Sequence, residues 1–156
     1  MRYLFTLLLI LTTLSTTSQR LVMSQPTAAN EYALIKRVAS EWIPADVTIH
    51  YISSSPIYPG YNGLTQQLEP KRYLIQMNPT DRDPVSRAYT LLHEMGHVID
   101  ACQGRLEFNP LRWDGKIYDG LVWKERPWEQ SANEWADCLM YEIFVEPELR
   151  RKGLIK

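Results

Sequence analysis

Histidine and cysteine are both scarce in this chain of 156 residues, which contains three histidines and two cysteines. Two cysteines are too few for a small fold held together by several disulfides. The chain also lacks an excess of one charge, because 17 basic and 18 acidic residues leave a formal net charge of −1. We therefore expect no nucleic acid as a main partner, since such partners require a basic patch. The length and the hydrophobic share of 45% are those of one ordinary globular domain.

Acidic residues are absent from the first 30 positions. Arg2 is followed by the apolar run 3–11 and then by a stretch rich in Thr and Ser. A basic start, a short apolar run and small polar residues are typical of a secretory signal peptide. The run is well short of the roughly 20 residues that a membrane-spanning helix needs.

These features predict a signal peptide at residues 1–29 and a folded domain at residues 30–156. The cleavage site stays open between Ser15–Thr17 and Thr27–Ala29, because both match the small-residue rule imperfectly. We expect a secreted or periplasmic protein with no stable membrane span after processing, and most simply a monomer. The alternative is a protein that an uncleaved N-terminal segment anchors to a membrane.

Hydrophobic periodicity predicts an α+β fold for the rest of the chain, with a short sheet and long helices. Residues 53–70, rich in Pro, Gly, Ser and Asn, are predicted to form a loop, and residues 104–126 show no clear period. The helix at 84–102 is expected to have Asp83 as its N-cap and Gly104 just beyond its end. Helices are predicted at 31–42, 84–102 and 127–145, the last ended by Pro147, and strands at 46–52 and 72–77.

The sequence His93-Glu94-Met95-Gly96-His97 lies inside the second predicted helix and has the pattern HExxH. Residues four apart share one face of a helix, so both imidazoles can bind the same metal ion. Glu94 can then act as the general base for a metal-bound water. The helix is apolar on most sides, and burying such polar side chains is costly unless they are paired or bind a metal. The pattern therefore favours a zinc site over two histidines that only pack in the core.

A catalytic zinc site needs a third protein ligand. The extended pattern HExxHxxGxxH is excluded, because Asp100 and Gln103 stand where it needs Gly and His. His50, on the first predicted strand, is more typical of a polar strand residue. The cysteines Cys102 and Cys138 each lie half a helical turn away from the metal side. A carboxylate of the last predicted helix is left as the third ligand.

The apolar arc of that last helix separates its carboxylates. Glu129 lies roughly 75° from the centre of the arc, whereas Glu134 and Asp137 lie about 145° and 155° away. Glu142 is near the edge of the arc but comes late in the helix. Glu129 is therefore favoured as the ligand, although a carboxylate in a first turn is also stabilised by the helix dipole. Asn133, one turn further along, can hydrogen-bond a ligand histidine.

Three segments together resemble the ImmA/IrrE family of small metallopeptidases, which has the gluzincin pattern of HExxH followed by a glutamate on a later helix. They are the strand Tyr73–Pro79, the segment Thr90–His97 and the segment Glu129–Ala136, within a match covering about residues 70–145. The resemblance implies a zincin-like domain with His93, His97 and Glu129 as zinc ligands and Glu94 as the base. Trp135 stands where the family usually has Phe. The family is mostly cytoplasmic and linked to regulators, unlike a chain with a leader, and 104–126 has no counterpart in it.

The function we expect is an exported zinc metallopeptidase that hydrolyses peptide bonds in peptide or protein substrates. The alternatives are a secreted metal-binding module without proteolytic activity and a zinc amidase that acts on cell-wall peptides. The intact Glu94 favours an enzyme, because a binding module needs no base at that position.

The sequence leaves open the substrate-binding strand, the state of the two cysteines, the oxyanion donor and the positions of the tryptophans. The strand at 72–77 could be an edge against which an extended substrate pairs. In an exported protein, Cys102 and Cys138 could form a disulfide between the two site-bearing helices. Four residues could stabilise the oxyanion, namely Tyr89, Tyr118, Tyr141 and His50. Core packing is expected of Trp42, Trp128 and Trp135, whereas Trp113 and Trp123 could line a substrate cleft.

Overall fold

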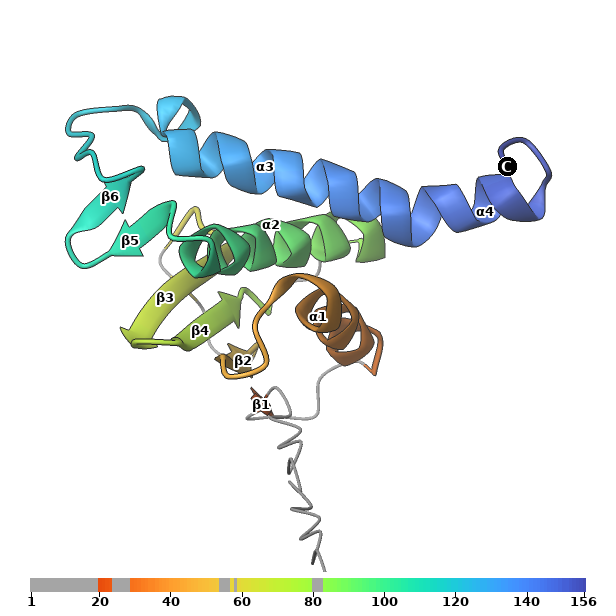
Figure 1. Cartoon of the computed structure of the whole chain (residues 1–156), viewed down its shortest axis with the longest axis horizontal. Helices are drawn as coiled ribbons and strands as arrows, with labels where there is room; N and C mark the ends of the chain where they lie inside the picture. Colours follow the sequence, from red (N-terminus) through yellow and green to blue (C-terminus); the bar gives the residue numbers. More distant parts are fainter. Residues whose placement is uncertain (1–19, 24–28, 54–56, 58, 80–82) are drawn as a thin grey trace, which may run out of the picture.

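A four-stranded sheet forms the lower layer of the computed structural model, which describes residues 20–23, 29–53, 57, 59–79 and 83–156 (Figure 1). The strand order is β1-β2-β4-β3. β1 and β4 run parallel to β2, and β3 runs antiparallel to β4. The strands are β1 (Arg20–Met23), β2 (Thr48–Ile52), β3 (Gly63–Glu69) and β4 (Arg72–Met77).

The hairpin formed by β3 and β4 corrects two predictions. The predicted loop at 53–70 contains β3, whose pairing with β4 compensates for a sequence that lacks a clear apolar alternation. The hairpin turn has Lys71 in the left-handed region, with φ at 61°. The strand predicted at 72–77 is β4 itself, but it lies inside the sheet between β2 and β3. The edge role proposed for 72–77 is therefore wrong, and β3 is the edge strand on that side.

The central helix α2 (Pro84–Cys102) has the bounds that the sequence predicts. Asp83 caps it by accepting hydrogen bonds from the backbone amides of Val85 and Ser86, at 3.1 and 2.9 Å. Pro84 fits the first turn because its missing N–H would have no partner there. The helix α1 (Ala29–Trp42) packs against α2, and the main core lies between these helices and the sheet (Figure 1).

Residues 104–126 fold into a short hairpin and a helical turn beside the N-terminal end of the last long helix. The hairpin consists of β5 (Leu106–Phe108) and β6 (Leu111–Trp113), and the turn is η1 (Trp123–Glu125). Leu106, Trp113 and Trp128 form a second buried cluster. Trp113 is thus a core residue, contrary to the cleft position expected for it. Trp42 is 37% exposed and contacts Trp135 edge to face, so it packs at the rim of the core.

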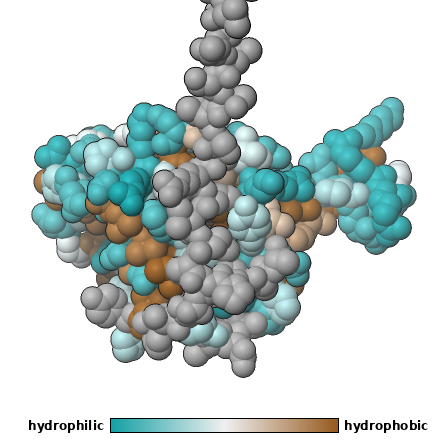
Figure 2. Space-filling model, turned by 90° about the horizontal axis from the view of Figure 1, so that it is seen from below, coloured by the Kyte–Doolittle hydropathy of each residue, from teal (hydrophilic) through white to brown (hydrophobic). Residues whose placement is uncertain are grey.

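The last helix is longer than predicted. α3 (Pro127–Met140) packs on the side of α2 that faces away from the sheet, then continues through the π-turn η2 (Tyr141–Val145) into α4 (Glu146–Arg151) (Figure 1). Pro147 does not end the helix, because it lies in the first turn of α4, where no intrahelical N–H bond is lost. This end projects from the body and is largely hydrophilic (Figure 2).

The predicted signal peptide falls mostly outside the described residues, since its parts at 1–19 and 24–28 are not among them. Its part at 20–23 forms β1, which pairs with β2. In the described part of the chain, no helix combines the length and the apolar character needed to cross a membrane. Cys102 and Cys138 are both free thiols, so the disulfide considered between them is not present.

Candidate metal centre

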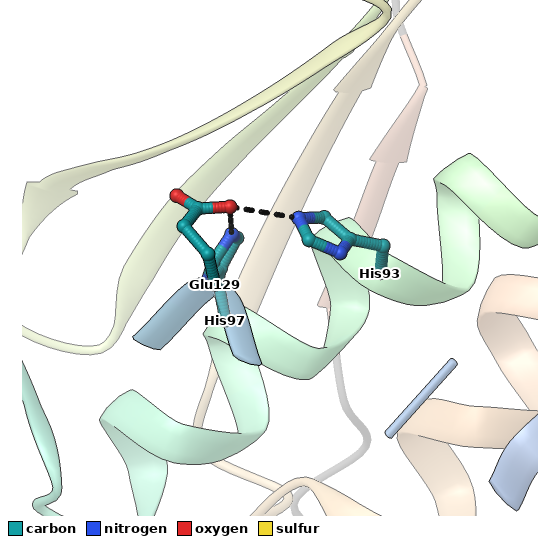
Figure 3. A group of neighbouring side chains, drawn as sticks. All are labelled: His93, His97 and Glu129. Carbon is teal, nitrogen blue, oxygen red and sulfur yellow. Dashed lines mark hydrogen bonds and ion pairs between the residues drawn. The ribbon is translucent and has the colours of Figure 1, made fainter. Parts of the chain in front are cut away.

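His93 and His97 lie one turn apart on α2 and are both buried, with 8% and 7% of their surface exposed. Their rings meet edge to face, with centroids 4.8 Å apart. The i, i+4 spacing brings both Nε2 atoms toward the same point on the α3 side of the helix (Figure 3).

Glu129 reaches the same point from the first turn of α3. Its Oε2 atom lies 3.2 Å from His93 Nε2 and 3.7 Å from His97 Nε2 (Figure 3). One ligand atom from each of the three residues fits within 4.8 Å of the others. Glu134 and Asp137 are exposed and Glu142 lies beyond the end of α3, and none of the three belongs to this group.

Gly96 allows α2 and α3 to approach closely enough for this meeting. A Cβ atom at position 96 would lie 2.9 Å from the Cβ of Trp135 and 3.1 Å from the Cα of Ala132. Both are fixed atoms of α3, so a side chain at position 96 would push the helices apart. Close packing of α2 against α3 therefore requires a glycine at position 96.

Asn133 orients the first histidine. Its Oδ1 atom lies 2.9 Å from Nδ1 of His93. Because a carbonyl oxygen only accepts, Nδ1 carries a proton, and the neutral ring then keeps its Nε2 lone pair for a metal. His97 differs, because its buried Nδ1 has no hydrogen-bond partner among the described residues. The ring of His97 is therefore positioned by packing and by Glu129 at its Nε2 atom, without a partner at Nδ1.

The pKa values of the two histidines are shifted in opposite directions. Burial opposes the charged form of His93, but its hydrogen bond to Glu129 and the nearby charge of Glu94 raise its pKa above the ordinary value. Burial and the neighbouring charge of His93 lower the pKa of His97 to about 4. His97 is therefore neutral near pH 7, which is the form that binds metal.

Glu94 is 5% exposed and contacts the edge strand β3. The hydroxyl of Thr65 lies 2.7 Å from Glu94 Oε2, to which it donates, and 3.0 Å from the Glu94 carbonyl oxygen. Gly63 leaves room for the same side chain, because a Cβ there would lie 2.5 Å from Glu94 Oε1. Burial raises the pKa of Glu94 to about 7, against the lowering effects of His93 and Thr65. A carboxyl group with such a pKa suits proton transfer near neutral pH.

An open cleft of about 920 Å³ connects these groups to solvent. Its walls come from the segment 59–66 with β3, from α2, from the β5–β6 hairpin and from the start of α3. Trp123 lies in the cleft as predicted, stacked on His93 with ring centroids 6.1 Å apart. The metal ligand atoms and Glu94 thus share one accessible space.

Of the four residues considered for the oxyanion, only Tyr89 lines the cleft. Tyr118 packs edge to face on Trp128, Tyr141 is in η2, and His50 is on β2 with its Nε2 atom 3.5 Å from Arg72. Partial burial and the nearby carboxylate of Asp137 raise the pKa of Tyr89.

Sequence reasoning does not identify Thr65 or Gly63 as site residues. Both lie in the segment predicted as a loop, so their proximity to Glu94 depends on the unpredicted pairing of β3 with β4. A weak signal is present, since Gly63 and Thr65 are two residues apart and a strand places such residues on one face.

The group formed by His93, His97 and Glu129 fits a metal ion by its donor chemistry. Two imidazole nitrogens and one carboxylate oxygen form a three-residue donor set typical of catalytic zinc, which leaves a further position for water. The buried His97 ring, neutral near pH 7, adds a second fitting feature. The described residues can therefore hold a divalent cation at this point.

Comparison with known proteins gives no relative: no protein-family model matches the chain, and no curated protein or solved structure matches it.

Proposed function

We propose that this protein is a zinc-dependent metallopeptidase of the gluzincin type, similar to the ImmA/IrrE family. One observation carries the proposal: His93, His97, Glu129 and a buried, hydrogen-bonded Glu94 face the same solvent-accessible cleft. A metal-binding module would need the three ligands but not a buried carboxyl group that Thr65 holds by a hydrogen bond beside them in the same cleft.

In this proposal each residue of the site has its own role. His93, His97 and Glu129 hold the zinc ion, and Asn133 fixes the proton on His93 Nδ1. A bound zinc ion would polarise the scissile carbonyl and lower the pKa of a water molecule. Glu94 takes the proton from the attacking water and gives it to the leaving amine. Tyr89, from the wall of the cleft, is the proposed donor to the oxyanion.

The edge strand β3 is the proposed support for an extended substrate. Within the described residues β3 pairs only with β4, so its other edge offers backbone donors and acceptors beside the cleft. Thr65 and Gly63 belong to this strand, so the same element holds Glu94 and borders the substrate path.

We also propose that the protein is exported and acts as a monomer. Cleavage near Ser15–Thr17 keeps β1 in the mature domain, whereas cleavage at Thr27–Ala29 removes it. The intact mass of the mature protein distinguishes the two sites. A mass that includes the entire N-terminal segment would instead support the anchored alternative.

The test of the peptidase activity compares the full chain with its Glu94→Gln variant, both loaded with zinc. Each is incubated with unfolded casein and, separately, with cell-wall peptides. We expect the native chain to cleave casein and the variant to lose at least about 100-fold in rate with its zinc retained, because general-base catalysis contributes at least that much. Cleavage of wall peptides alone would support the amidase. Bound zinc without cleavage of either substrate would overturn the enzyme assignment.

A further inference from the structure

Positive charge is almost absent from the wall of the cleft. Among the described residues that line it, Arg126 is the only lysine or arginine. The others are apolar, uncharged polar, or members of the metal group and its neighbour Glu94. Apart from the proposed metal site, the guanidinium of Arg126 is therefore the feature of the described wall that favours an anion.

Arg126 has no carboxylate partner within the part of the chain that the structure describes. Every other arginine whose side chain is described has one at 3.9 Å or less. Its sequence neighbours do not fill this role, because Glu129 is directed at the two histidines and Glu125 makes no ion pair with Arg126. The charge of Arg126 is thus left for a group outside the described protein.

The guanidinium is nevertheless held in place. Its Nε atom donates to the carbonyl oxygen of Leu121 at 3.4 Å, and its carbon lies 5.9 Å from the ring centroid of Trp128. These contacts occupy Nε and one face of the group, so the terminal nitrogens are left for a ligand. A pre-oriented guanidinium loses less side-chain freedom on binding than a mobile one.

We propose that Arg126 binds a carboxylate of the peptide substrate, and that it makes the protein selective for substrates with such a group near the scissile bond. This inference rests on the proposed peptidase function. A carboxylate fits because its two oxygens match the terminal nitrogens of a guanidinium. Arg126 is the N-cap residue of α3, three residues before Glu129, and it lines the same cleft as the metal group, so a carboxylate bound there would share that cleft with the metal.

The carboxylate can be the C-terminus of the substrate or an acidic side chain, and two pairs of probes distinguish these sources. The first pair is N-acetyl-Phe-Ala with a free C-terminal carboxylate and the same peptide as its amide. The second pair is N-acetyl-Phe-Glu amide and N-acetyl-Phe-Gln amide. Dissociation constants are measured by calorimetry on the full-length, zinc-loaded chain and on the metal-free chain.

The native chain is expected to bind the acidic member of one pair at least about tenfold more tightly than its neutral match, as hydrogen bonds to charged groups usually allow. In Arg126→Gln this preference falls to less than about twofold. The matched control Lys124→Gln, an exposed residue on η1, keeps the full preference. Arg126→Lys, which restores the charge, regains part of the preference and shows that the loss is not caused by misfolding.

Two results would overturn the inference: no preference in either pair, or a preference that survives in Arg126→Gln. The second result would mean that the metal itself binds the carboxylate. Binding does not require hydrolysis, so this test is separate from the casein assay. A chain that binds acids through Arg126 but cleaves nothing overturns the peptidase alone, and one that cleaves without a preference overturns only the role of Arg126.

Discussion

Thr65 on the edge strand donates a hydrogen bond to the carboxylate of Glu94 on the central helix, with a distance of 2.7 Å between the two oxygens. This contact engages one carboxylate oxygen and leaves the other for a water molecule. Thr65→Val removes the donor without changing the shape of the side chain. We expect the turnover number to fall by at least about tenfold with the zinc content unchanged, because the base loses its fixed position.

The conservative change Thr65→Ser is the control for that prediction, since it keeps the hydroxyl. It should leave the turnover number within about threefold of the native value. Equal losses in the Val and Ser variants would show that the threonine methyl group matters instead of the hydrogen bond.

Asn133 is expected to strengthen metal binding, because it accepts the proton on His93 Nδ1 in a hydrogen bond and so keeps Nε2 directed at the metal. Asn133→Leu removes the acceptor at similar volume, so the ring is free to rotate. We expect zinc to bind about 10–100-fold more weakly, the usual effect of removing such an outer partner. Competition with a zinc-binding dye measures the affinity. Glu134→Gln, an exposed change on the same helix, is the control, and an equal loss there would remove the specific role of Asn133.

Gly96 controls the spacing between α2 and α3. In Gly96→Ala the new methyl group meets fixed atoms of Trp135 and Ala132. We expect the free energy of unfolding to drop by about 1–3 kcal/mol, as for other overpacked sites, together with weaker zinc binding because Glu129 moves with α3. Urea unfolding with and without zinc measures both effects. Unchanged stability would mean that the helices separate without cost.

The pH dependence of stability in the metal-free protein follows from Glu94. Its pKa is about 7 in the folded protein, above the ordinary value of 4.5. A raised pKa means that the folded state prefers the protonated form, so this stabilising contribution is fully present below pH 4.5 and is lost as the pH rises through 7. The loss is on the order of 3 kcal/mol.

Glu94→Gln stays neutral at every pH and isolates this effect. Relative to the native chain, the metal-free variant should unfold at higher urea concentration at pH 8 but at a similar concentration at pH 4. Glu134→Gln should show no such change with pH. A difference between Glu94→Gln and the native chain that is the same at both pH values would contradict the raised pKa.

Much of the fold follows from local sequence signals. Asp83, Pro84 and Gly104 delimit α2 because caps and glycine stops act within a few residues. β4 is predictable because Tyr73, Ile75 and Met77 alternate into the core. β3 has no such signal, since Gln66 and Gln67 occupy its middle and its pairing depends on the neighbouring strand.

In the candidate site, too, the features set by local sequence are predictable and the contacts between distant segments are not. The i, i+4 spacing on α2 predicts that His93 and His97 share one face, and the apolar arc of α3 favours Glu129 as their partner. The structure groups these three residues. The contacts of Thr65 with Glu94 and the position of Arg126 depend on how β3 and the residues before α3 fold back on the cleft. Such contacts between distant segments carry no periodicity that a single sequence reveals.

The zinc content of the purified chain and of two matched variants tests the central claim most directly. After dialysis against a weak chelator, the native chain should retain one equivalent of zinc, and so should Glu134→Ala, whereas Glu129→Ala should lose it. Retention of zinc with native affinity in Glu129→Ala, or its absence from the native chain, would contradict a metal centre formed by His93, His97 and Glu129.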